Sequence, residues 1–437
     1  MKIFIETLGC PKNFNDSEFA LGILEKAGHS EAMTPEEADV ILVNTCGFIN
    51  DAKKESIDKI FEMAEICGND KLLAVSGCLS ERYKDELYKE MPEVDIFVGV
   101  NDYDRLPALI DNAVKEKQGL SFRDDYCDFN DPMLRKIPEN PYTATIKIAE
   151  GCNNICTYCI IPSIRGRYRS RKIEEIVKEA ERLAEAGTKE LIVIAQDITY
   201  YGMDIYGKLA LPELLRELCK VDGIRWIRLM YCYEDKITDE LIETMASEEK
   251  ICNYIDIPIQ HSSDRILKAM NRKSTKSSIM STISKLREKM PDINIRTTLI
   301  TGFPGETKED FEELYDFVHE VRFERLGIFA YSREEGTPAD KMKGHIRQDI
   351  KEKRRDSIML MQTEISLEKN REKIGKTLEV IVDGRDDDGS YYGRSRYDAP
   401  EIDNAVLFTS EEELAPGDFV NVRITDAFDY DLVGEAL

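Results

Sequence analysis

Residues 143–159 read TATIKIAEGCNNICTYC, and they join a predicted strand to three closely spaced cysteines. The strand candidate is 143–151, and the cysteines that follow it have the spacing C-x3-C-x2-C. In a chain of this cysteine content the spacing arises by chance with odds of roughly one in a hundred. It places the thiolates of Cys152, Cys156 and Cys159 on one tight loop, as cysteine ligation of an iron–sulfur cluster requires.

No nearby fourth cysteine follows this loop, although structural zinc sites and ferredoxin clusters usually have a fourth protein ligand. A cluster with three protein ligands leaves one iron open to bind another molecule. Such an open coordination position is typical of a catalytic centre.

The segment around the loop, residues 138–368, alternates six predicted strands with helical runs. The strand candidates are 143–151, 190–197, 225–233, 254–261, 293–303 and 324–332. Six repeats are two short of an eightfold barrel, so we expect an open, partial parallel (β/α)6 barrel. Its active site should lie at the carboxyl edge of the strands.

Residues 1–117 also alternate strands and helices, which predicts a second parallel α/β sheet domain. Cys10, Cys46 and Cys78 each come directly after a predicted strand. Because parallel strands end at the same edge of a sheet, we expect the three thiols to converge in space. Three small apolar residues at strand ends are the alternative, but the shared position favours a metal site.

The remainder of the chain is a linker, a long helix and a small β domain. Residues 118–137 are polar and lack periodicity, and 346–375 read as an amphipathic connecting helix. Its basic residues Lys351, Lys353, Arg354 and Arg355 are read as a solvated face. Short strands separated by Gly and Asp turns predict a five-stranded antiparallel, OB-like barrel over 371–437.

Composition restricts the class of protein. The 437 residues are 42% hydrophobic, which excludes wholesale disorder. The formal net charge of −25 disfavours a polyanionic partner and favours a basic one. Eleven cysteines, an odd number, and the lack of a secretory signal point to the reducing cytoplasm. No apolar run approaches the roughly 18 residues of a membrane span, so no membrane partner is expected.

The C-x3-C-x2-C loop at the end of the first strand of a partial barrel resembles the radical S-adenosylmethionine (SAM) superfamily. The resemblance implies that the open iron binds SAM. It also implies that an electron from the cluster cleaves SAM to methionine and a deoxyadenosyl radical, which abstracts hydrogen from an unactivated carbon. The protein then orients the reactants and excludes water.

Over its whole length the chain resembles the methylthiotransferases, which join a domain with three cysteines, a radical SAM barrel and a TRAM barrel. Cys10, Cys46 and Cys78 match the ligands of an auxiliary 4Fe–4S cluster, and Cys152, Cys156 and Cys159 match those of the radical SAM 4Fe–4S cluster. The implied reaction uses one SAM as methyl donor and another as radical source, with sulfur delivered at the auxiliary cluster.

Within this family the motifs Gly9–Asn13 and Asp16–Glu18 resemble the RimO branch, which modifies the β-carbon of an aspartate in the twelfth small-subunit ribosomal protein. The alternative is a MiaB-like enzyme acting on a tRNA adenosine, but that branch usually has Gln where this chain has Pro11. Further stretches resemble the RimO branch: Ala195–Asp197, Tyr254–His261, Arg296–Thr307 and Tyr331–Pro338.

Charge provides a separate test of the substrate. TRAM barrels ordinarily bind RNA, yet residues 371–437 contain seven Lys and Arg against seventeen Asp and Glu. Such a surface repels a phosphate backbone and attracts a basic ribosomal protein, so direct nucleic-acid binding is disfavoured. General acidity for solubility is the alternative. The resemblance also implies a flavodoxin-like or ferredoxin-like electron donor.

Several other residues are candidates for a role at the site. The resemblance implies SAM contacts for Tyr158, Gln196 and Asp197. Four arginines alternate after the cysteine loop and could share one strand face that binds a carboxylate, or could be solvated: Arg165, Arg167, Arg169 and Arg171. His261 is read as structural, and Gly302–Thr307 as a sharp turn. The other cysteines are read as small apolar residues: Cys67, Cys127, Cys219, Cys232 and Cys252.

Overall fold

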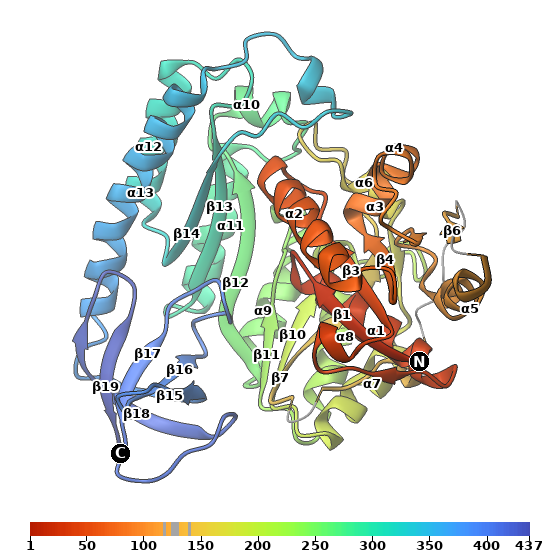
Figure 1. Ribbon diagram of the computed structural model, residues 1–437. Helices are drawn as coiled ribbons and strands as arrows, with labels where there is room; N and C mark the ends of the chain where they lie inside the picture. The colour runs from red at the N-terminus through yellow and green to blue at the C-terminus, as the bar shows by residue number, and fades with distance from the viewer. Residues whose placement is uncertain (117–118, 124–130, 139–140) are drawn as a thin grey trace.

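The computed structural model describes residues 1–116, 119–123, 131–138 and 141–437 (Figure 1). Cys127 lies outside the described residues, as does part of the predicted linker. The described chain forms an N-terminal domain, a central domain and a C-terminal barrel. Among the helices of this described part, none is long and apolar enough to cross a membrane.

The N-terminal domain is a six-stranded parallel sheet in the order β2-β1-β3-β4-β5-β6. The strands are β1 Lys2–Thr7, β2 Ser30–Glu31, β3 Val40–Thr45, β4 Leu72–Gly77, β5 Ile96–Val98 and β6 Gly119–Ser121. The helices are α1 Pro11–Lys26, α2 Asn50–Cys67, α3 Cys78–Arg82, α4 Lys84–Glu90 and α5 Leu106–Glu116. The predicted parallel sheet is confirmed, with β2 and β6 as additional short strands. Strand order reverses between β1 and β3, the position at which such sheets bind ligands.

The central domain is an open sheet of six parallel strands in the order β14-β13-β12-β11-β10-β7, which confirms the predicted partial barrel. The strands are β7 Thr143–Lys147, β10 Glu190–Ile194, β11 Trp226–Leu229, β12 Ile251–Gln260, β13 Asn294–Thr301 and β14 Arg325–Ala330. A small antiparallel pair consists of β8 Ala149–Glu150 and β9 Arg169–Ser170.

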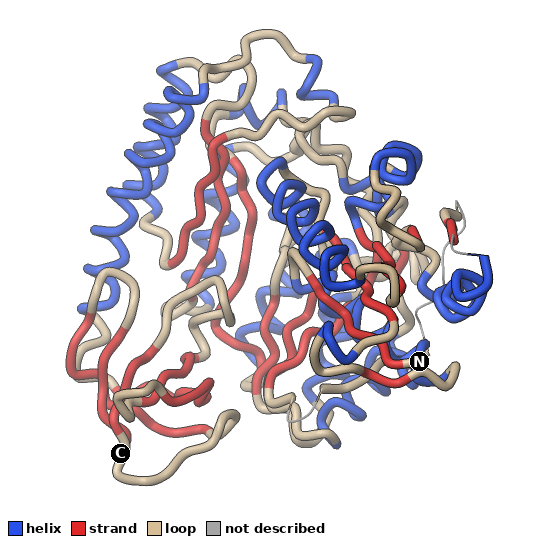
Figure 2. Tube along the Cα trace, viewed as in Figure 1, coloured by secondary structure: helices blue, strands red, loops and turns tan. Residues whose placement is uncertain are grey.

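Helices pack along the outer side of this sheet, as Figure 2 shows, and bury a core of Ile, Leu and Val side chains. They are α7 Ile173–Glu185, α8 Leu211–Cys219, α9 Asp239–Ser247, α10 Asp264–Ala269, α11 Lys276–Lys289, α12 Lys308–Val321 and α13 Gln348–Arg371. The short helix α6 Ile161–Arg165 lies instead against α3 of the N-terminal domain. The short 3-10 helices are η1 Pro35–Glu37, η2 Tyr103–Arg105, η3 Pro132–Leu134, η4 Ile198–Tyr200, η5 Glu234–Lys236 and η6 Pro338–Lys341.

The C-terminal barrel closes in the order β15-β16-β17-β19-β18. Its strands are β15 Thr377–Arg385, β16 Tyr391–Ser395, β17 Val406–Thr409, β18 Phe419–Ala427 and β19 Leu432–Ala436. The predicted five-stranded barrel is confirmed. Neighbouring strands are antiparallel except β17 and β19, which run parallel.

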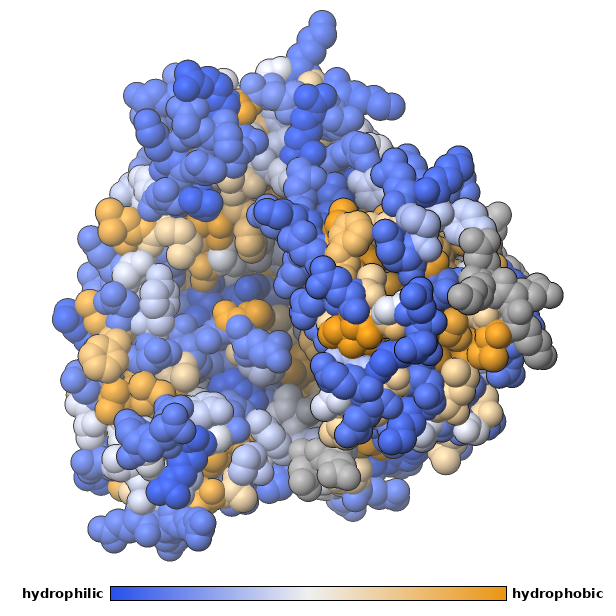
Figure 3. All heavy atoms as spheres, viewed as in Figure 1, coloured by the Kyte–Doolittle hydropathy of each residue, from blue (hydrophilic) through white to orange (hydrophobic). Residues whose placement is uncertain are grey.

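The two flanking units contact opposite edges of the central sheet. The barrel contacts the first residues of the strands: Arg394 pairs with Glu190 of β10 at 2.7 Å, and Asp398 pairs with Arg325 of β14. The N-terminal domain contacts β7 and the loops after the strands, where Asp16 pairs with Lys147. The face in Figure 3 is hydrophilic over most of its area and hollowed between the N-terminal domain and the strands β12–β14.

Candidate functional site

The N-terminal domain brings three thiols to one edge of its sheet. Cys10 precedes α1, Cys46 follows β3, and Cys78 opens α3. Cys10 and Cys78 both lie near enough to Cys46 to affect its ionisation. The backbone at Gly9 also touches Cys46, because a Cβ at Gly9 would lie 2.7 Å from Cys46 Cβ. We call these three residues the N-terminal triad.

The environment of Cys46 and Cys78 favours neutral thiols. Burial raises the pKa of Cys46 to about 11, and burial also raises the pKa of Cys78. A metal that binds such thiols deprotonates them, so coordination and proton release are coupled. Arg165 of the central domain donates to Cys78 Sγ at 3.4 Å and opposes part of this shift.

The C-x3-C-x2-C segment forms the loop between β8 and α6, and its three cysteines are the loop triad. Asn154 N–H donates to Cys152 Sγ at 3.4 Å, and Cys156 Sγ lies 3.3 Å from Tyr233 Oη. Burial raises the pKa of Cys152 to about 11 and that of Cys159 to about 12. The loop is anchored from the carboxyl side of β12, where Asn271 donates to the carbonyl of Ile155 at 2.9 Å.

The chemistry of the two triads decides what they could hold. Within the described ranges, no three His, Cys, Asp or Glu side chains are grouped so that they could hold a single metal ion. Thiolates that ligate a four-iron cluster each bind a different iron, so they stand farther apart than the ligands of one ion. A group of three cysteines suits iron–sulfur chemistry.

The three residues expected to contact SAM lie beside the loop triad. Tyr158 Oη accepts a hydrogen bond from Arg272 at 3.3 Å. Gln196 donates to Glu150 at 3.1 Å, and its Oε1 is buried without a partner among the described residues. Both oxygens of Asp197 are occupied, one by Thr199 and the other by Asn154 and Lys236 (3.1 Å).

Arg272 is a site residue that the sequence analysis did not identify. It is 6% exposed, and its guanidinium lies 4.0 Å from the centroid of the Tyr233 ring. Its Nε and Nη2 have no hydrogen-bond partner in the described part of the chain. The sequence around Arg272 contains no motif that indicates a functional site. The side chains that Arg272 contacts, Tyr158 and Tyr233, come from distant loops.

The four alternating arginines do not share one strand face. Arg165 lies in α6, Gly166 turns the chain with φ +73°, and Arg169 lies in β9. Arg167 is exposed, whereas Arg171 is 6% exposed and pairs with Glu179 at 2.6 Å. The alternation at period two therefore spans a helix end and a turn rather than one strand.

Arg165 belongs to a buried ion network between the N-terminal and central domains. Asp16 of α1 lies 2.5 Å from Lys147 and 2.6 Å from Arg165, and both cations also pair with Glu150. Burial alone would raise the pKa of Glu150, but Lys147 and Arg165 outweigh it and lower that pKa. The motif Asp16–Glu18 therefore forms part of the interface between the N-terminal and central domains.

Glu334 forms a second bridge between the same domains. It pairs with Lys53 of α2 at 2.9 Å and with Arg82 of α3 at 3.1 Å, and its exposed side-chain fraction is 4%. The stretch Tyr331–Pro338 therefore holds the N-terminal domain against the central sheet.

Other residues noted in the sequence have structural contacts. His261 is fully buried, accepts from Ser263 N–H at 2.9 Å and lies 3.5 Å from Glu306. In the connecting helix, Lys351 is buried and donates to the carbonyl of Tyr331 at 2.7 Å, and Arg354 pairs with Glu306 at 2.5 Å. Only part of that predicted basic face is therefore solvated.

The four remaining described cysteines are free thiols in apolar surroundings. They pack in hydrophobic clusters: Cys67, Cys219, Cys232 and Cys252. This agrees with their interpretation as small apolar residues.

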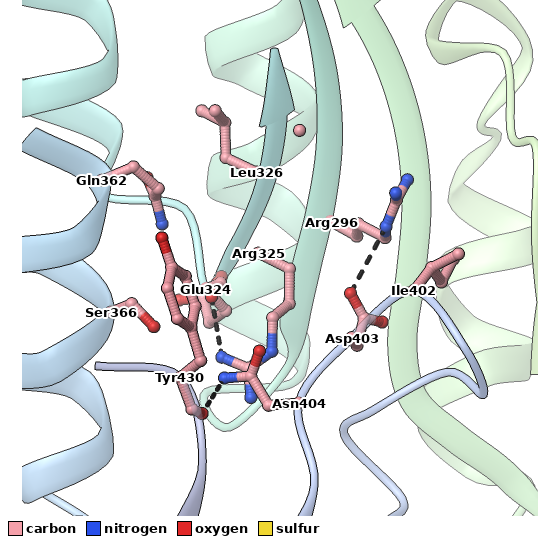
Figure 4. A pocket seen from close by; sticks show the side chains of 11 residues that line it. Arg296, Glu324, Arg325, Leu326, Gln362, Ser366, Ile402, Asp403, Asn404 and Tyr430 are labelled. Atoms are coloured by element: carbon pink, nitrogen blue, oxygen red, sulfur yellow. Dashed lines mark hydrogen bonds and ion pairs between the residues drawn. The ribbon is translucent and has the colours of Figure 1, made fainter. Parts of the chain in front are cut away.

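A cavity of about 100 Å³ lies far from both triads, between β13, β14, α13 and the barrel (Figure 4). Arg296 and Asp403 form an ion pair of 3.4 Å on its wall. Arg296 and Arg325, which line the cavity, lie near the starts of β13 and β14. The cavity therefore lies at the junction with the barrel, and the cysteines lie at the opposite edge of the sheet.

Three family models match the chain. They are the Radical SAM superfamily over residues 146–318, the uncharacterized protein family UPF0004 over residues 2–99, and the TRAM domain over residues 374–437.

Curated relatives match along the full length. The "Ribosomal protein uS12 methylthiotransferase RimO" of Clostridioides difficile is 52% identical over 439 residues, which covers 100% of this chain and 99% of that protein. The protein of the same name from Clostridium acetobutylicum is 50% identical over 440 residues, with 99% and 98% covered.

Two solved structures share the fold. The radical SAM methyltransferase TsrM from Kitasatospora setae has a TM-score of 0.57 at 15% identity, with 77% of this chain and 76% of that chain covered. The cobalamin-dependent radical enzyme OxsB has a TM-score of 0.54 at 13% identity, with 78% and 54% covered.

Proposed function

Because this chain belongs to the RimO family of radical SAM methylthiotransferases, we propose that it methylthiolates the β-carbon of an aspartate in ribosomal protein uS12. The observation that carries the proposal is the full-length identity of about half to RimO proteins, together with two groups of three thiols at the strand edges where two domains meet. A ribosomal substrate places the reaction in the cytoplasm.

Membership in the radical SAM superfamily implies a 4Fe–4S cluster and SAM. We assign that cluster to the loop triad within a core of residues 138–368. An auxiliary 4Fe–4S cluster is assigned to the N-terminal triad within residues 1–117, and residues 371–437 are assigned as the TRAM domain. When bound, these groups supply the reducing electron, the hydrogen-abstracting radical, and the sulfur and methyl group that are added.

The chain's own residues orient the reactants. Gln196 has an unpartnered buried oxygen that can accept from SAM, and Arg272 has two unpartnered donor nitrogens suited to a carboxylate. Tyr158 is proposed to lie near the adenine. Asp197, the third SAM contact implied by the resemblance, fixes Asn154 of the cysteine loop. The ion network of Asp16 and Arg165 holds the two domains in one orientation.

Charge supports a basic protein as substrate. The barrel has few cations, and Arg394 is buried against Glu190, where it cannot contact RNA. Electrostatic attraction between the acidic chain and a basic ribosomal protein speeds their encounter. A flavodoxin-like or ferredoxin-like protein is the proposed electron donor.

Mass spectrometry of uS12 and of tRNA from a strain lacking this gene tests the proposal. We expect uS12 to lose a methylthio group from one aspartate, and tRNA to be unchanged. Loss of a methylthio group from a tRNA adenosine, with uS12 unchanged, would establish the MiaB-like activity instead. Reduced, reconstituted enzyme should also release deoxyadenosine from SAM.

A further inference from the structure

Lys12 is a buried cation without a carboxylate partner. It lies in the first turn of α1, two residues after Cys10, and is 7% exposed. Among the described residues it has no ion pair or hydrogen bond. Lysines are almost never buried unless they are paired, because an unpaired charge loses its hydration. Lys147 illustrates the usual case, since it is 3% exposed and contacts both Asp16 and Glu150.

The contact that Lys12 does make is aromatic and crosses the domain interface. Its Nζ lies 3.3 Å from the centroid of the Tyr231 ring, which belongs to the central domain. A cation over an aromatic face is stabilised while its charge remains uncompensated. Among the described residues no carboxylate lies beside this ammonium, so it can still pair with an anion.

Tyr231 is held in an unusual conformation at the carboxyl edge of β11. Its φ is +63°, although it is not glycine, and its N–H donates to Asp256 at 3.0 Å. Such strain persists where the surroundings fix a residue, and it concentrates at functional sites. The ring is thus fixed under the ammonium.

Lys12 and Tyr231 each lie close in sequence to a residue of, or in contact with, one of the two triads. Lys12 follows Cys10 of the N-terminal triad by two residues, and Tyr231 precedes Tyr233 by two. Tyr233 Oη lies 3.3 Å from Cys156 of the loop triad. The ammonium therefore stands where the two cysteine-bearing edges meet.

We propose that Lys12 binds the side-chain carboxylate of the target aspartate and so determines specificity for an acidic side chain. This inference rests on the proposed function. The β-carbon is bonded directly to that carboxylate, so an ion pair at the carboxylate fixes the carbon that reacts. An asparagine or a nucleobase offers no negative charge to this ammonium, and it is therefore rejected.

The test uses reconstituted full-length enzyme with uS12 and with a uS12 variant in which the target aspartate is asparagine. Lys12→Met removes the charge, Lys12→Arg retains it, and Lys26→Met is a matched control on the exposed end of the same helix. Binding of each uS12 form is measured together with the methylthiolated product. Iron content and deoxyadenosine release without uS12 are measured in parallel.

For uS12 we expect Lys12→Met to weaken binding about tenfold or more, the usual effect of losing a charge-assisted bond. Lys12→Arg should restore most of it, and Lys26→Met should match the wild type. The asparagine form should bind the wild type about tenfold more weakly and should bind Lys12→Met as well as uS12 does. Iron content and deoxyadenosine release should be unchanged.

Two results would overturn the inference. One is a Lys12→Met enzyme that still prefers aspartate to asparagine by the wild-type factor. The other is loss of deoxyadenosine release without uS12, which would assign Lys12 to the SAM carboxylate. If the wild type fails to modify uS12 at all, the proposed function itself is wrong, whatever the Lys12 variants do.

Discussion

Arg165 of the central domain donates a hydrogen bond to the sulfur of Cys78 in the N-terminal domain, with Nη2 3.4 Å from Sγ. The same guanidinium donates to Asn13 Oδ1 at 2.9 Å and pairs with Asp16. One side chain therefore links a proposed cluster ligand to the interface that orients the domains. Hydrogen bonds to ligating sulfurs tune reduction potentials, so domain orientation and cluster potential should be coupled.

Replacing Arg165 with Met should lower the free energy of unfolding by about 3 kcal/mol, because Asp16, 1% exposed, keeps only Lys147 as counter-charge. Urea denaturation measures the change. Arg167→Met is the matched control, since Arg167 is exposed in the same loop and should change stability little. Equal effects of the two substitutions would contradict the role given to the buried network.

Gly9→Ala should disrupt the N-terminal triad. Gly9 has φ +96°, and an added Cβ would lie 2.7 Å from Cys46 Cβ and 3.1 Å from its Sγ. Gly28→Ala isolates the backbone strain, because Gly28 has φ +92° and a Cβ added there would meet nothing within 4 Å. Reconstituted Gly28→Ala should bind about eight irons per chain, as two 4Fe–4S clusters require, and Gly9→Ala about four.

Removing the N-terminal triad and removing the loop triad should have different effects on the cleavage of SAM. Changing Cys10, Cys46 and Cys78 to Ala should reduce iron to about four per chain and abolish methylthio transfer, while deoxyadenosine release continues. Changing Cys152, Cys156 and Cys159 to Ala should leave about four irons and abolish that release. An unchanged iron content in either variant would rule out the corresponding cluster.

Glu190 should make the free energy of unfolding depend on pH. Burial alone would raise its pKa, but Arg394 and Arg228 lower it to about 2. A lowered pKa contributes stability above the unfolded value near 4.5, and that contribution is lost as pH falls toward 2. Glu190→Gln should cost about 3 kcal/mol at pH 7 and less at pH 3. Thermal unfolding from pH 7 to 3 measures this, with exposed Glu213→Gln as the control that should track the wild type.

The strands were predictable because buried parallel strands form short apolar runs between periodic helices. The first helix, α1, spans Pro11–Lys26 and begins directly after Cys10. Its first turns contain polar residues that are buried against another domain: Lys12, Asn13 and Asp16. Apolar periodicity fails there, because ion pairs and aromatic contacts take the place of a hydrophobic face.

The candidate site was predictable only where its residues share one loop or one strand edge. The cysteine spacings follow from local geometry and could be identified directly. Arg272 and Lys12 could not, because the rings of Tyr233 and Tyr231 that surround them come from distant parts of the chain. The alternating arginines do not share one face, because the turn at Gly166 separates Arg165 from the arginines that follow it.

The position of the C-terminal barrel has a consequence for the size of the partner. The barrel contacts the beginnings of the central strands, and the cysteine loop follows their ends. The eight residues of β13 span about 26 Å at the usual rise of a strand. A partner that contacts both the barrel and the cysteine edge must therefore be at least that long. An extended peptide of fewer than about eight residues is too short to contact both.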